Sequence, residues 1–214
     1  MIPAPDLLLF FGLVFGIVIL PGLDMAFILG SALVGGRAMG FAAIAGIVAG
    51  GFFHVAIGSL GIAIVLQLFP AAFAALLVVG AAYMAWIGVS IWKSGATLGA
   101  PEGTAPLSRA ATFRRGALTN ILNPKAYAFM LAIFPQFVRP DRGPIATQAL
   151  ELATIITSTQ IGVYGILVCA ADRAKGWFGR HPRVERGLAK GVGLLLVAGA
   201  LWSVAEGVRK LAAP

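Results

Sequence analysis

The chain has 214 residues, of which 59% are hydrophobic and 11% are charged, and its formal net charge is +8. Soluble globular domains carry about 25% charged residues, so this composition excludes an ordinary soluble domain and indicates a polytopic membrane protein. The basic residues lie between apolar segments and form no aromatic-lined patch, which excludes nucleic-acid binding. The single cysteine, Cys169, excludes an intrachain disulfide and a thiolate metal cluster.

Six membrane-spanning helices are predicted from the apolar segments. The N-terminus lacks the basic region of a secretory signal, so the first apolar segment is expected to be retained as a span. Between Arg37 and Lys93 there is no Asp, Glu, Lys or Arg, and a segment of this length holds two spans of about 20 residues each, with a turn at 67–70. The predicted spans are residues 6–30, 40–66, 70–93, 115–138, 145–170 and 188–208.

A linker rich in Gly, Ala, Pro and Thr, residues 95–112, divides this single transmembrane domain into two halves, residues 1–94 and 113–210. Each half has three predicted spans, so the halves are expected to cross the membrane in opposite directions. Most Lys and Arg residues flank the same ends of the spans, and the loop 172–190 is strongly basic. Because basic loops remain in the cytoplasm, both termini are predicted to be periplasmic, and this loop is expected to contact anionic lipids.

The most unusual stretch of the chain is Asn120–Lys125, which lies within an apolar run. A charge such as that of Lys125 is costly near the bilayer centre and marks a functional site by default. Pro124 lacks a backbone N–H and clashes with the preceding turn, so it breaks or kinks a helix. Asn120 and Asn123 add amide groups at the same place. We therefore predict a binding site at a break in the fourth span.

The first span contains a related stretch. A shift of 102 residues places Ile19–Leu29 on Ile121–Leu131, with five of eleven residues identical. The first stretch also combines a helix break, at Pro21 and Gly22, with one charge, Asp24. At about 1.5 Å per residue the two charges have compatible depths. The pattern predicts an all-helical inverted repeat with discontinuous first and fourth helices; in so apolar a chain, coincidence is the alternative.

Further polar residues lie within the predicted spans. In the fifth span Glu151, Thr154 and Ser158 share one face with small residues, and this face is expected to line a cavity or to pack against another helix. Glu151 lies close to the outer end of the span, so an interfacial position is the alternative to a functional one. His54 in the second span could relay protons, because its charge changes near neutral pH, or could be a structural histidine at a close helix contact.

Six motifs follow one another in an order that resembles a known family. They are Pro21-Gly-Leu-Asp-Met25, Gly35-Gly-Arg-Ala-Met-Gly40, Gly80-Ala-Ala-Tyr-Met-Ala-Trp-Ile-Gly88, Phe113-Arg-Arg-Gly-Ala-Leu-Thr-Asn120, Asn123-Pro-Lys125 and Phe134-Pro-Gln-Phe137. Together they cover nearly the whole chain and resemble the LysE/RhtB amino-acid exporters. The resemblance implies a six-span carrier of the bacterial inner membrane, not an enzyme, that exports amino acids or derivatives such as homoserine, threonine, lysine or homoserine lactone by proton antiport. This chain has Leu23 where the family usually has the second proline of Pro-Gly-Pro. The first helix break is therefore expected to be softer, that is, to bend the chain less than the second break does.

Asp24 and Lys125 are predicted to bind the two ends of a zwitterionic amino acid. Its carboxylate is expected near Lys125 and the backbone donors freed at Pro124, and its ammonium near Asp24. Asp24 is also the candidate proton carrier, because burial disfavours an ionised carboxylate and a neighbouring lysine favours it. The structural alternative is a buried Asp24–Lys125 pair that only holds the two halves together.

Two other classes of function remain open. A divalent metal-ion exporter of related architecture would use Asp24, His54 and Glu151 as its acidic and imidazole ligands. A membrane-embedded enzyme would need a nucleophile or a metal constellation, for which one cysteine and two histidines offer little. The sequence contains no nucleotide loop, zinc motif or nucleophile elbow, so no cofactor is predicted and coupling to an ion gradient is expected. A homodimer is considered because three-helix repeats bury little surface.

Overall fold

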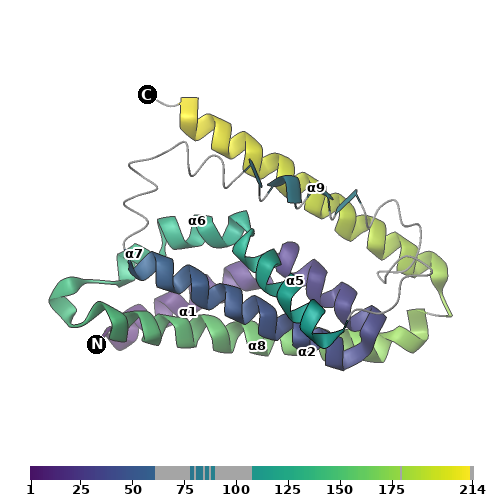
Figure 1. The fold of residues 1–214 in the computed structure, drawn as a ribbon, viewed down its shortest axis with the longest axis horizontal. Coiled ribbons are helices and arrows are strands. Elements are labelled where there is room, and N and C mark those ends of the chain that lie inside the picture. Colours follow the sequence, from purple (N-terminus) through teal and green to yellow (C-terminus); the bar gives the residue numbers. More distant parts are fainter. Residues whose placement is uncertain are drawn as a thin grey trace.

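The computed structural model describes residues 1–60, 108–178 and 180–212, together with short pieces between 78 and 89. Every element of regular structure in this described part is helical, as the sequence predicts (Figure 1). The predicted turn at 67–70, most of the predicted third span and most of the predicted linker lie outside the described residues.

The first predicted span is a broken helix. α1 (Ala4–Ile19) and α2 (Leu23–Ser59) are separated by residues 20–22, which include Pro21. The backbone of α2 is itself kinked at Gly36, where φ is 70° and ψ is −167°. Only glycine adopts this conformation without strain. α2 therefore supplies both the second part of the first predicted span and the described part of the second.

The fourth predicted span is broken in a similar way. α5 (Arg109–Ile121) and α6 (Pro124–Ala132) are separated by residues 122–123, and α7 (Phe134–Phe137) follows α6. α5 begins inside the predicted linker, because the Ser108 hydroxyl accepts a hydrogen bond from the Ala111 N–H at 3.2 Å and caps the first turn. Both helices that were predicted to be discontinuous are thus interrupted in the structure.

Two long helices complete the chain. A short 3₁₀ turn, η1 (Pro140–Arg142), leads into α8 (Ile145–Phe178), and α9 (Pro182–Ala212) follows. The predicted basic loop 172–190 is therefore wrong as a loop, since only residues 179–181 separate the two helices. Lys and Arg are good helix formers, and α8 and α9 continue through the basic segment. The segments Leu23–Ser59 and Ile145–Ala174 are long and apolar enough to cross a membrane, with mean hydropathies of 1.9 and 1.7.

Two apolar clusters hold the helices together. The larger one joins α1, α2, α6 and α8, and its fully buried members include Phe10, Ile47 and Leu152. The smaller one contains Leu23 and Ala26 from the start of α2, Ala81, and Leu196 and Ala200 of α9. The break between α1 and α2 lies between Val18 of the larger cluster and Leu23 of the smaller one.

α2 and α5 approach each other closely along a row of glycines. A Cβ atom at Gly46 would overlap the Phe113 carbonyl oxygen, and one at Gly50 would lie 2.8 Å from Asn120 Cβ. These are the two glycines of the Gly46-x-x-x-Gly50 pattern, which is typical of close helix packing in membranes. Their lack of side chains allows the last turn of α5, with Asn120, to lie against α2.

Polar contacts join other parts of the chain to α8 near both of its ends. Before its first turn, Arg142 forms a salt bridge with Asp6 at 2.6 Å, and the Met1 ammonium donates to the Arg142 carbonyl oxygen at 2.8 Å. Near its other end, Asp172 forms a salt bridge with Arg37 at 2.7 Å. Segments that the distribution of basic residues assigns to one side of the membrane therefore lie together at each end.

The α2–α5 contact gives a first prediction. Gly46→Ala is expected to lower the unfolding midpoint of the detergent-purified protein, because the new methyl group overlaps backbone atoms of α5; overpacking of this kind costs about 1–3 kcal/mol. The measurement is thermal unfolding followed by tryptophan fluorescence. Gly162→Ala on α8 is the matched control, since a Cβ there meets no atom within 4 Å. Equal midpoints for the Gly46→Ala variant and the original protein would contradict the packing.

Candidate substrate site

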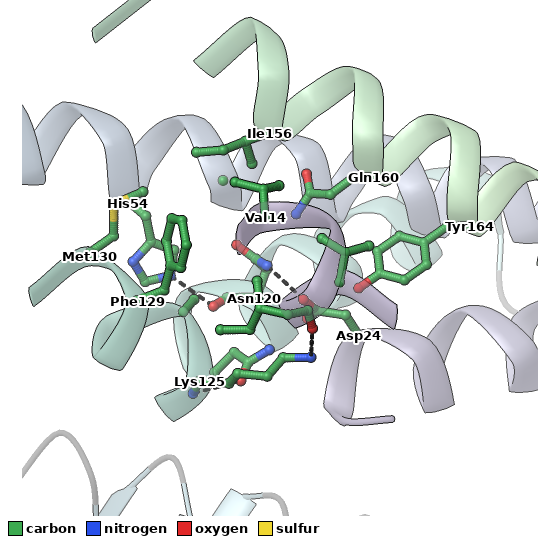
Figure 2. A pocket seen from close by; sticks show the side chains of 15 residues that line it. Val14, Asp24, His54, Asn120, Lys125, Phe129, Met130, Ile156, Gln160 and Tyr164 are labelled. Atoms are coloured by element: carbon green, nitrogen blue, oxygen red, sulfur yellow. Dashed lines mark hydrogen bonds between the residues drawn. The ribbon is translucent and has the colours of Figure 1, made fainter. Parts of the chain in front are cut away.

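A pocket lies between the two helix breaks (Figure 2). α1, α2, α6, α8 and the last turn of α5 all contribute to its wall. The polar residues that line it are Asp24, His54, Asn120, Asn123, Lys125, Gln160 and Tyr164, and the others are Val14, Ile17, Val18, Gly51, Ala126, Phe129, Met130 and Ile156.

Asp24 is the second residue of α2, directly after the first break, and only 4% of its surface is exposed. A helix N-terminus favours a negative charge at this position, because the backbone N–H groups of the first turn point toward it. One carboxylate oxygen, Oδ2, accepts a hydrogen bond from Asn120 Nδ2 at 2.9 Å. The other oxygen, Oδ1, is buried and has no hydrogen-bond partner among the described residues.

Lys125 does not form an ion pair with Asp24. Its ammonium instead donates hydrogen bonds to the carbonyl oxygens of Ile17 and Leu20, both at 3.0 Å. In an unbroken helix the Ile17 carbonyl would accept from residue 21, but that residue is Pro21 and has no N–H. The lysine therefore supplies the donor that the proline removes, at the end of α1 where a cation is favoured.

Gly22 makes room for this contact. A Cβ atom at Gly22 would lie 3.2 Å from Lys125 Nζ, so a larger residue would press on the ammonium. The predicted importance of the Pro21-Gly22 pair thus has a physical basis. Pro21 leaves the Ile17 carbonyl without its helical donor, and Gly22 leaves room for the Lys125 ammonium to bind that carbonyl.

His54 makes the equivalent contact at the second break. Its Nε2 lies 2.9 Å from the Asn120 carbonyl oxygen, which also accepts the Asn123 N–H at 2.9 Å. The usual donor to that carbonyl would be residue 124, which is Pro124. Since a carbonyl oxygen only accepts hydrogen bonds, Nε2 carries a proton in this contact. His54 is 1% exposed, and its Nδ1 has no partner in the described part of the chain.

Asn123 caps α6. Its side-chain oxygen Oδ1 accepts the backbone N–H of Lys125 at 3.0 Å, which is the contact of an N-cap residue. Its Nδ2 is buried without a hydrogen-bond partner among the described residues. Lys125 is the second residue of α6, just as Asp24 is the second residue of α2. The two charges thus occupy the same position relative to the two breaks.

Leu23 does not prevent the first break. It is the first residue of α2, a position whose N–H has no partner within a helix and where proline is tolerated without loss. Leucine or proline at this point leaves the same backbone hydrogen bonds, so the expected softening of the break by Leu23 has no counterpart in the geometry.

Unpartnered polar atoms gather in the pocket. Six buried side-chain N or O atoms lack a hydrogen bond within the described residues, and five of them belong to residues that line the pocket. In native proteins such atoms are few, and they are normally satisfied by water or by a ligand. The five are Asp24 Oδ1, His54 Nδ1, Asn120 Oδ1, Asn123 Nδ2 and Gln160 Oε1.

The face of α8 toward the pocket differs from the predicted one. Ile156, Gln160 and Tyr164, spaced four residues apart, line the pocket. Thr154 and Ser158 are exposed, and their hydroxyl groups donate to carbonyl oxygens one turn earlier in their own helix, at 2.8 and 2.6 Å. The structure therefore does not bring the predicted polar face of the fifth span into the pocket.

Glu151 also lies away from the pocket. Its Oε2 accepts a hydrogen bond from the backbone N–H of Ile2 at 3.1 Å, so it joins α8 to the start of the chain.

Gln160 and Tyr164, which line the pocket, were not predicted from the sequence. An uncharged amide in the middle of an apolar span was the available signal for Gln160; Tyr164 has no comparable signal. The structure shows no group of three or more His, Cys, Asp or Glu residues placed to hold a metal ion among the residues it describes.

The model of the LysE type translocator family matches residues 14–205. The chain belongs to the LysE type translocator family. This family consists of translocators, and the chain is accordingly a membrane transport protein.

Relatives of the chain carry names of efflux proteins and of uncharacterised membrane proteins. An uncharacterised membrane protein of Pseudomonas aeruginosa is 32% identical over 191 residues, 87% of this chain and 88% of the relative. A homoserine/homoserine lactone efflux protein of Salmonella typhi is 30% identical over 166 residues, 77% of this chain and 80% of the relative. A leucine efflux protein of Enterobacter sp. is 26% identical over 188 residues, 85% of each chain. No solved structure matches this chain.

The contact between Lys125 and the first break gives a second prediction. Lys125→Met leaves the Ile17 carbonyl without a donor and is expected to lower the unfolding midpoint. Pro21→Ala returns an N–H to the helix, so the double variant should be more stable than the sum of the two single effects predicts. A coupling free energy of about 0.5–3 kcal/mol is expected for such directly linked positions, measured by thermal unfolding in detergent.

The control for this cycle combines Lys125→Met with Gly162→Ala, which lies in open space on α8. These two changes should be additive. If Lys125→Met and Pro21→Ala are also additive, the lysine does not replace the donor that Pro21 removes.

Proposed function

We propose that this LysE family protein exports amino acids or close derivatives of them from the cytoplasm in exchange for protons. The observation that carries the proposal is the set of five unpartnered polar atoms around one pocket between two helix breaks. The names of the relatives from Salmonella typhi and Enterobacter sp., which refer to homoserine and leucine efflux, support a small amino acid as the substrate.

The chemistry of these atoms complements a zwitterion. Asp24 Oδ1, Asn120 Oδ1 and Gln160 Oε1 are acceptors, and a substrate ammonium has three N–H groups to donate. Asn123 Nδ2 is a donor. The Lys125 ammonium has three N–H groups, of which two bond the carbonyls of α1. In the proposed complex the remaining lysine N–H and the Asn123 amide bind the substrate carboxylate.

Asp24 is the proposed coupling group. The described residues place no cation in salt-bridge contact with it, and the hydrogen bond from Asn120 is neutral. An ionised carboxylate without an ion-pair partner is costly in a low-dielectric interior. Either a substrate ammonium or a proton can remove that cost, and the two exclude each other at a single carboxylate oxygen. Because the substrate and the proton compete for this oxygen, binding of one releases the other, and the site couples their movements.

The architecture that fits this mechanism is an inverted repeat of three spans in each half, with the substrate bound midway across the inner membrane. It is supported by the matching positions of Asp24 and Lys125 after the two breaks. The concentration of basic residues on one side favours a cytoplasmic position for Arg37 and for the α8–α9 junction, with both termini in the periplasm.

The test uses purified protein in liposomes with a pH-sensitive dye in the lumen and a panel of labelled amino acids. In the original protein, amino-acid movement should be accompanied by proton movement in the opposite direction. Asp24→Asn should lower counterflow about 10-fold to 100-fold, because a hydrogen bond to a charged group is worth about 1.5–3 kcal/mol, and it should abolish the coupled proton signal.

Two further variants complete this experiment. Asp24→Glu keeps the carboxylate and should retain proton coupling at a reduced rate. Ser158→Ala removes only a hydroxyl that bonds its own helix on the exposed face of α8, and it should behave like the original protein. Counterflow and proton movement that are unchanged in Asp24→Asn would refute the proposed role of Asp24.

A further inference from the structure

The apolar part of the pocket restricts the class of substrate. We propose that the protein selects amino acids whose side chains are uncharged and aliphatic, and that Met130 is the residue that adapts the pocket to side chains of different length. This inference rests on the proposed function, because it concerns the same pocket.

The first support is the count of charged groups in the pocket wall. Among the described residues that line the pocket, Asp24 is the only carboxylate and Lys125 is the only lysine or arginine. In the proposed complex both are used by the ammonium and the carboxylate that every amino acid carries. A second ionised group, as in lysine, arginine or glutamate, would enter the pocket without a partner of opposite charge, and burying an unpaired charge is strongly unfavourable.

The second support is the chemistry of the remaining wall. Val14 of α1, Phe129 and Met130 of α6 and Ile156 of α8 line the pocket, and each is at most 8% exposed. Figure 2 shows Val14 and Ile156 above Asp24 and Lys125, with Phe129 and Met130 to one side. A substrate whose two charged ends lie at Asp24 and Lys125 would direct its side chain toward these apolar groups, where aliphatic carbon is favoured over polar atoms.

Phe129 and Met130 differ in how firmly they are held. The Phe129 ring packs against Phe10, with ring centroids 5.7 Å apart, and Phe10 packs in turn against Phe137 at 4.9 Å. Met130 has an unbranched side chain whose sulfur lies beside Gly58, 3.5 Å from the position that a Cβ there would take. Methionine has several rotatable bonds and fills irregular spaces well. Phe129 therefore forms a fixed wall and Met130 an adjustable one.

The experiment is counterflow in liposomes that hold the purified full-length protein, with labelled leucine, methionine, homoserine, lysine, arginine and glutamate. The original protein should exchange leucine and methionine, and it should exchange lysine, arginine and glutamate at least about 100-fold more slowly, as the burial of an unpaired charge requires. Homoserine, which is uncharged in its side chain, should be exchanged as well.

A pair of variants tests the role of the wall. Met130→Glu places a carboxylate on the apolar side and should raise lysine exchange about 10-fold or more over Met130→Gln, which has the same size and no charge. Both variants should show the elution profile of the original protein on size-exclusion chromatography before they are compared. Met130→Ile, whose branched side chain is stiffer, tests the adapting role separately and also serves where Met130→Glu does not fold: it should change the ratio of methionine to leucine exchange.

The outcomes separate the two proposals. Lysine exchange as fast as leucine exchange in the original protein would overturn the selection for uncharged side chains, while leaving amino-acid export intact. Equal lysine exchange by folded Met130→Glu and Met130→Gln would overturn the placement of Met130 beside the substrate side chain. An unchanged ratio of methionine to leucine exchange in Met130→Ile would overturn its adapting role. Absence of exchange for every amino acid in the panel would overturn the proposed function itself.

Discussion

The structure depends on two carbonyl groups that prolines leave without their helical donors. Within a membrane no bulk water can replace a missing backbone hydrogen bond, so each open carbonyl needs a donor from the protein. The Ile17 carbonyl receives the Lys125 ammonium, and the Asn120 carbonyl receives His54 Nε2 together with the Asn123 N–H. Each of the two side-chain donors comes from a distant part of the chain, and its contact therefore fixes a helix break and joins two segments at once.

The hydrogen bonds of Lys125 to α1 determine which polar atoms of the pocket are free to bind a substrate. Because the Lys125 ammonium lies at the end of α1, the Asp24 carboxylate is left with one free oxygen in the pocket. A direct pair between the two residues would have satisfied both charges and left no electrostatic reason for a ligand to bind. The close α2–α5 contact at Gly50 contributes as well, since it brings Asn120 near enough to bind Asp24 and leaves the second oxygen open.

The sequence was sufficient to locate both helix breaks and the charges beside them, because proline and an intramembrane charge have strong local consequences. It could not identify the partner of Lys125, since a backbone carbonyl has no signature of its own in a sequence. The face of α8 was misplaced for a related reason: the hydroxyl groups of Thr154 and Ser158 are satisfied by their own helix, so polarity on a helical wheel did not show which side faces the pocket. Gln160 has no such local partner for its Oε1.

The two breaks are alike in geometry and opposite in charge. Asp24 and Lys125 each occupy the second position of the helix that follows a break. A helix N-terminus stabilises the aspartate and disfavours the lysine, and the lysine side chain accordingly extends away from its own helix to the carbonyl end of α1. Two equivalent helix breaks thus place a hydrogen-bond acceptor, the Asp24 carboxylate, and a donor, the Lys125 ammonium, at the same pocket. A molecule with an ammonium and a carboxylate on one carbon matches both groups, whereas a metal ion would match only the carboxylate.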